Sequence, residues 1–173
     1  MLLSGLNIRI KSIQTGQINI NATTNTASIN AVDLDNSLLF HLGQATTSNY
    51  YSSGLSYVKL DNSTTVRATR KYDDATTYVR YAVVEFYPHT FKSIQRGLIT
   101  SWVAETGTYT ISAVDTTKSI LMHLGQISGV DAQPDAHAQL ATIELSDSET
   151  ITGTLGDYLT APPTVSFQIA EIF

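Results

Sequence analysis

The stretch AVDLDNSLLFHLGQ (31–44) returns as AVDTTKSILMHLGQ (113–126), with nine of fourteen positions identical. A second echo precedes it, because KSIQTG (11–16) returns as KSIQRG (92–97). Both repeats recur about 82 residues further along the chain. Self-similarity at a fixed period indicates a duplicated structural unit. The sequence therefore predicts a tandem repeat of one small unit.

The end of each copy shows the period of a β-strand. VRYAVVEFY (79–87) aligns with VSFQIAEIF (165–173), and apolar residues occupy alternate positions in both, starting at Val79 and Val165. Such alternation predicts a strand with one buried face. By the same logic, one face of an earlier strand is expected to point inward in both copies, with the residues Leu38, Phe40 and Leu42 and their counterparts Ile120, Met122 and Leu124.

Turn residues separate these runs, and no window carries a capped helical pattern. We therefore expect an all-β protein with two tandem, closely packed homologous β-sandwich or barrel units of about six short antiparallel strands each. Residues 1–88 would form the first unit and residues 89–173 the second, with Pro88 at the junction. The pattern leaves open whether the units are separate sandwiches or share a sheet.

Composition narrows the class of protein. Ser and Thr together make 41 of 173 residues, only 14% of residues are charged, and cysteine is absent, which excludes disulfides and thiolate metal sites. The chain shows no signal-peptide pattern and no apolar run of about 20 residues, so we expect assembly in a reducing cytosol and no membrane partner. The net charge of −5 argues against a nucleic-acid partner, although the first 88 residues carry +1 and the remainder −6.

Two groups of polar residues are candidates for metal sites. His41 and His123 hold equivalent places in the copies, but no carboxylate stands at a ligand-like spacing, which favours half-exposed strand histidines bonded to a neighbouring loop. Asp131, Asp135 and His137 share the loop VDAQPDAHAQ, whose spacing matches no calcium or zinc loop and favours a solvated segment. We expect no metal and no cofactor.

The loop ATTSNYYSSGLS (45–56) is the candidate contact surface. Tyr50 and Tyr51 lie among Ser, Asn and Gly, a composition typical of adaptable recognition loops. Tyrosines near strand ends also pack against sheets and subunits. The sequence leaves binding and plain packing as equal alternatives.

Basic residues of the first copy interleave with tyrosines, a pattern that can stack nucleotides. Asp73 and Asp74 nearby, and the absence of a known nucleic-acid motif, favour a patch that meets an acidic protein neighbour. These basic residues are Lys59, Arg67, Arg70, Lys71 and Arg80. No phosphate loop, nucleophile elbow or paired-carboxylate motif is present, so we expect no catalytic residues and no enzyme activity.

As an ordered set, the repeated motifs carry a resemblance. IKSIQTGQINI (10–20) and YVRYAVVEFYP (78–88) in the first copy, with FKSIQRGLIT (91–100) and VSFQIAEIF (165–173) in the second, resemble small tandem-repeat β-rich virion structural proteins of tailed bacteriophages. The resemblance spans the chain from residue 8 and brings no catalytic residues. It implies a virion protein, assembled in the host cytoplasm, that decorates a capsid or associates with a head or tail.

Two functions follow from this resemblance. The first is a non-enzymatic structural protein that reinforces the capsid by docking on the shell and on neighbouring copies, with the major capsid or tail protein as partner. Self-association, as a trimer, is expected by analogy with decoration proteins. The alternative is a receptor- or glycan-binding module of a tail or head fibre that uses the Tyr50 and Tyr51 loop.

Overall fold

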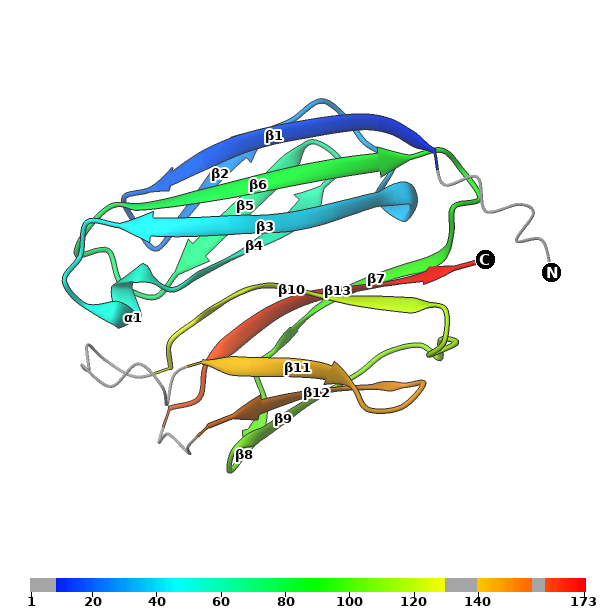
Figure 1. Cartoon of the computed structure of the whole chain (residues 1–173). Helices are drawn as coiled ribbons and strands as arrows, with labels where there is room; N and C mark the ends of the chain where they lie inside the picture. Colours follow the sequence, from blue (N-terminus) through cyan, green and yellow to red (C-terminus); the bar gives the residue numbers. More distant parts are fainter. Residues whose placement is uncertain (1–8, 130–139, 157–160) are drawn as a thin grey trace.

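The computed structural model describes residues 9–129, 140–156 and 161–173, except for the side chains of residues 51 and 52 (Figure 1). It confirms the all-β class: two short helical turns, η1 (Leu34–Asn36) and α1 (Tyr51–Gly54), interrupt a series of antiparallel strands. The strands in chain order are β1 (Ile10–Ile20), β2 (Thr24–Ser28), β3 (Ser37–Thr46), β4 (Ser56–Asn62), β5 (Thr65–Arg70), β6 (Thr77–Phe86), β7 (Phe91–Ile99), β8 (Trp102–Val103), β9 (Thr106–Thr110), β10 (Ser119–Ile127), β11 (Ala141–Leu145), β12 (Thr150–Leu155) and β13 (Thr164–Ile172).

The strands form three sheets. One has the order β1-β6-β3, the second β2-β5-β4-β10-β13-β7, and the third β11-β12-β9-β8. The second sheet joins strands from both halves of the chain, because Gly125 of β10 pairs with Tyr57 of β4. The halves therefore share a sheet by edge pairing. A division into domains at residues 88 and 89 stays a prediction.

Each half is built around an apolar cluster, and the first cluster also includes Leu124 of β10 from the second half. Val79, Tyr81 and Val83 of β6 lie in a cluster between β1-β6-β3 and β2-β5-β4. Residues 165, 167 and 169 of β13 lie in a second cluster with Ile99 and Ile151. The alternation on the two closing strands is thus confirmed, since β-branched and aromatic residues at every second position bury one face.

The predicted inward face of β3 and β10 is wrong in part. Leu39, not Leu38, lies in the first core, whereas Leu38 and Phe40 pack in a third cluster between the halves. Leu42 and Ile120 are exposed. Both faces of β3 are buried at its start, and its register with β6 shifts between His41 and Gln44, so simple alternation fails there.

The two halves repeat their polar anchors at aligned positions. Buried Glu85 accepts hydrogen bonds from Lys11 Nζ at 2.8 Å and from the Asp33 N–H at 3.1 Å. Buried Glu171 accepts the corresponding bonds from Lys92 Nζ at 2.8 Å and from the Asp115 N–H at 3.0 Å. Each glutamate ties the first strand of its half to the loop before the bulged strand.

Candidate functional site

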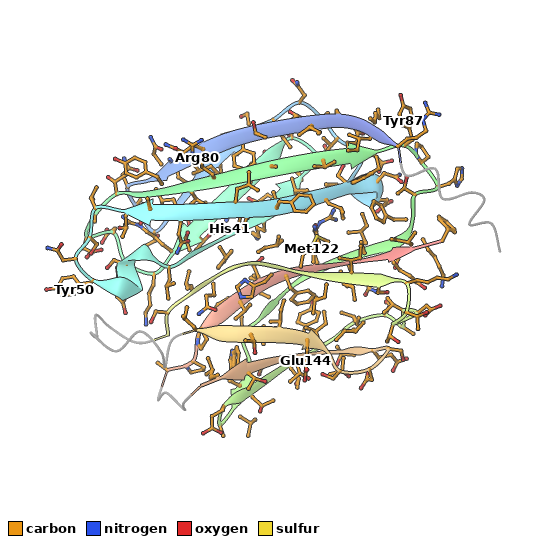
Figure 2. All side chains as sticks on the ribbon, viewed as in Figure 1. His41, Tyr50, Arg80, Tyr87, Met122 and Glu144 are labelled. Carbon is orange, nitrogen blue, oxygen red and sulfur yellow. The ribbon has the colours of Figure 1, made fainter. Side chains whose placement is uncertain are left out.

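The Tyr50 loop is held in place by hydroxyl contacts to a neighbouring loop. Ser48 Oγ and Ser53 Oγ both donate to Asp74 Oδ2, at 3.1 and 2.9 Å. Tyr50 precedes α1 and is 56% exposed, at the outer end of the molecule in Figure 2. Tyr51 begins α1, but its side chain lies outside the described part of the structure. The loop therefore presents one described aromatic ring on an anchored backbone.

The equivalent histidines lie near each other where the halves meet. His41 is half-buried, and its ring lies against the backbone of Gly125, two residues after His123. Burial lowers the pKa of His41; the positive charge of His123 lowers it further and a hydrogen bond with Gln44 opposes the shift. Each Nδ1 accepts a hydrogen bond from the glycine two residues on, at 3.3 Å from Gly43 and 3.1 Å from Gly125.

No metal-ligating cluster occurs among the residues that the structure describes. Asp131, Asp135 and His137 lie outside those residues.

Most of the basic residues named above are engaged within the chain. Lys59 Nζ and Arg67 Nε contact the two carboxylate oxygens of Asp61, at 3.2 and 2.5 Å. Arg70 is buried, where its Nε donates to the Ala22 carbonyl at 2.8 Å, and Lys71 Nζ donates to the Gly129 carbonyl. Arg80 is exposed on β6. These contacts do not bring the five cations together as an open stacking surface.

The contact between the halves is built on the outer face of β7-β13-β10, away from the core of the second half. Gln168 is fully buried there, and its amide bonds both backbone groups of Leu39 on β3. The Leu39 N–H donates to Oε1 at 3.2 Å, and Nε2 donates to the Leu39 carbonyl at 2.9 Å. The Gln168 side chain therefore makes the two backbone hydrogen bonds that a neighbouring strand would make with Leu39 at the edge of β3.

Two more polar side chains complete this contact. Arg96 Nη2 donates to the carbonyls of Leu34 and Ser37, at 2.9 and 2.6 Å, and burial lowers the pKa of this guanidinium although Asp35 opposes the shift. Ser166 Oγ donates to the Val58 carbonyl at 3.0 Å. Phe86 and Phe91 meet edge to face in the third cluster, with ring centroids 5.1 Å apart.

Sequence reasoning missed Arg96, Ser166 and Gln168. These residues lie on the strand faces opposite the apolar core positions. In a single isolated unit, such faces would be exposed to solvent. A signal was present in the divergence of the copies: Ser166 and Gln168 align with Arg80 and Ala82, so the outer face of β13 lacks the charge found on β6.

We call the outer face of β7-β13-β10 the covered face. The open face is the exposed part of the outer face of β1-β6-β3, along β1 and around Leu42; the remainder of that outer face, with Leu38 and Phe40, packs in the third cluster between the halves. Residues of the covered face are Ile94, Arg96, Leu124, Gly125, Ser166 and Gln168, and their aligned counterparts on β1-β6-β3 are Ile13, Thr15, Leu42, Gly43, Arg80 and the buried Ala82. Leu124 is 1% exposed, whereas Leu42 is 56% exposed. A groove of about 450 Å³ lies on the open face between Leu42, Gly43, Tyr78 and Arg80.

Comparison of the chain with protein-family models, with curated proteins and with solved structures found no match. Among the described residues, no helix has the length and apolar character needed to cross a membrane.

Proposed function

We propose that the chain is a non-enzymatic structural protein of a bacteriophage virion, assembled in the host cytoplasm, which reinforces the capsid by docking on the shell and on neighbouring copies. The observation that carries the proposal is the open face. Its counterpart on the second half is buried under protein, while Ile13 and Leu42 are exposed on the first half. Exposed apolar side chains on a face whose counterpart is buried favour a protein partner.

The architecture supports a mechanical role. The six-stranded sheet crosses from one half to the other, and buried polar side chains fasten the halves at Leu39, Ser37 and Val58. Force applied to one half would pass through backbone hydrogen bonds to the other, without a flexible linker. The resemblance to phage virion proteins supports a location on the virion, with the major capsid or tail protein as partner.

Fractionation of purified particles tests the proposal. A decorating protein is expected in many copies per particle, in a fixed ratio to the major capsid protein. Quantitative mass spectrometry of the particle band measures that ratio. A chain that is absent from the particles, or present in only a few copies, would overturn capsid decoration.

The exposure of Tyr50 favours a second candidate, a receptor- or glycan-binding module of a tail or head fibre. Tyr50 is exposed, its backbone N–H donates to Ser48 Oγ at 3.0 Å, and Asp74 anchors the loop. An exposed aromatic ring with polar neighbours in the sequence suits a glycan site. The double substitution Tyr50→Ala and Tyr51→Ala would then reduce adsorption to host cells. Unchanged adsorption would exclude this role for the loop.

A further inference from the structure

The part of the contact between the halves that surrounds β4 is heterologous, because each half contributes a different surface there. The third cluster differs, since it gathers aligned outer-face residues of both sheets, Val84 and Phe86 of β6 with Ala170 and Ile172 of β13. The second half contributes its covered face, and the first contributes the edge of β3 and the start of β4. A heterologous contact leaves one unused surface of each kind at the ends of the pair. The unused face here is the open face. The unused edge is the corresponding region of the second half, at β11 and at the start of β10 around Ile120, because the end of β10 already pairs with β4 at Gly125.

Aligned glycines show that the open face is empty where the covered face is filled. Both residues lie in the left-handed region, with φ of 111° at Gly43 and 94° at Gly125. A Cβ at Gly125 would collide with the Ser56 carbonyl of β4, whereas a Cβ at Gly43 would meet nothing within 4 Å. Backbone can therefore approach Gly43 as β4 approaches Gly125.

The matching edge of the second half is exposed as well. Leu38 is 5% exposed in the contact between the halves, but its counterpart Ile120 is 48% exposed. At the described residues, β11 is an end strand of its sheet, and β3 is an end strand of β1-β6-β3. End strands carry unpaired backbone groups that favour pairing with another strand.

We infer that the open face binds the second half of another copy of the same chain, with β11 of that copy laid beside Gly43 of β3 as β4 is laid beside Gly125 of β10. Alignment of the halves makes Thr142 the counterpart of Tyr57, so the predicted pairing is Gly43 with Thr142. The groove on the open face, about 450 Å³, would receive the start of β11. This inference rests on the self-association part of the proposed function.

Charge on the two surfaces supports this partner. In the contact between the halves, Lys59 and Ser166 line one small pocket of about 230 Å³. Their counterparts in the intermolecular contact are Glu144 and Arg80, both exposed and opposite in charge (Figure 2). The first 88 residues carry a net +1 and the remainder −6, which also favours pairing of a first half with a second half.

The intermolecular contact lacks two clamps of the internal one. Thr15 and Ala82 stand where the covered face has Arg96 and Gln168. The contact is therefore reversible and concentration-dependent, and because it is heterologous it builds a ring, such as a trimer, or an open filament. Exposed polar pairs respond to salt, so high ionic strength weakens it.

Sedimentation analysis of the purified full chain tests the inference. The wild type is expected to associate as its concentration rises, while Arg80→Glu and Glu144→Arg each raise the dissociation constant about tenfold. The double variant restores association, because each contact then pairs the exchanged charges. Glu149→Arg, an exposed charge reversal outside the contact, is the matched control for Glu144→Arg and leaves association unchanged.

A second pair of variants tests the apolar part of the contact. Leu42→Asp abolishes association, whereas Val103→Asp, at an exposed apolar residue of β8, does not. A monomeric wild type, or undiminished association of Leu42→Asp and Arg80→Glu, overturns the inference. A monomeric chain found in fixed ratio on particles overturns this inference alone, whereas a chain that associates but is missing from particles overturns only the virion role.

Discussion

The sheets β1-β6-β3 and β7-β13-β10 are built alike inside but differ outside. Each sheet buries one glutamate on its central strand, Glu85 on β6 and Glu171 on β13. Each sheet also has a register shift after an equivalent histidine, His41 on β3 and His123 on β10. On the outer face, the second sheet presents Arg96 and Gln168 to the first half, where the first sheet has Thr15 and Ala82. The comparison separates what one unit needs to fold from what two units need to join.

Substitution of the shared glutamates tests the part that the halves have in common. Glu171→Ala and Glu85→Ala are each expected to lower the free energy of unfolding by about 3 kcal/mol, because each removes a buried carboxylate that accepts several charge-assisted hydrogen bonds. Urea denaturation measures the loss. The exposed control Glu149→Ala should change stability by less than about 0.5 kcal/mol. Markedly unequal losses from the two glutamates would show that the halves are not built alike.

The alternation of apolar residues in the sequence predicted the buried face of the closing strands β6 and β13, because packing inside each unit determines which face is buried. Val79 and Val165 both lie in apolar cores, as their period-two patterns indicate. The prediction was wrong at Leu42 and Ile120, which are exposed although their counterparts Leu124 and Leu38 are buried. The contact between the halves covers different positions in the two copies. An apolar pattern that the copies share therefore cannot show which copy has the buried residue at a given position.

The candidate site could be predicted only where it depends on loop composition. Tyr50 is exposed, as a contact residue must be, but whether it binds a partner stays a prediction. The divergence of the copies marks Gln168, but its partner could not be predicted from sequence, because that partner is the Leu39 backbone 129 residues away. A polar residue on the outer face of a strand is predicted to face solvent unless the surface that covers it is known.

The aligned glycines allow the difference between the faces to be measured directly. Gly125→Ala is expected to cost about 3 kcal/mol, since a methyl group there adds a collision with the Ser56 carbonyl to the strain of a positive φ. Gly43→Ala has only the backbone strain and should cost about 1 kcal/mol. Thermal unfolding of both variants measures the gap, and equal losses would mean that the β4 contact at Gly125 contributes nothing.

Gln168→Ala tests the clamp that only the covered face has. Its removal leaves the Leu39 N–H and carbonyl buried without partners, which should lower the free energy of unfolding by about 2 kcal/mol. Amide hydrogen exchange at Leu39 should accelerate more than exchange in the strands of the first core. Gln17→Ala, at an exposed position of the open face, serves as the control and should leave both readouts unchanged. Unaltered protection of Leu39 would assign its ordering to β6 alone.

The histidines at the junction should give the smallest effect, as a dependence on pH. His41 has a folded pKa below its unfolded value because burial and the charge of His123 disfavour its protonation. The unfolded chain therefore binds the proton more readily, so this contribution is complete above about pH 6.5 and is lost as the pH falls below it. The free energy of unfolding should therefore be lower at pH 5.5 than at pH 7.5.

His41→Gln should reduce that dependence, since an amide keeps a polar group at the junction without taking up a proton. Part of the dependence should remain, because burial also lowers the pKa of His123. His89→Asn is the matched control, because His89 is exposed and asparagine tolerates its φ of 68°. The control should retain the wild-type slope between pH 7.5 and 5.5. If His41→Gln retained the full slope as well, protonation of His41 would have no effect on stability, and the slope would have another source, such as His123.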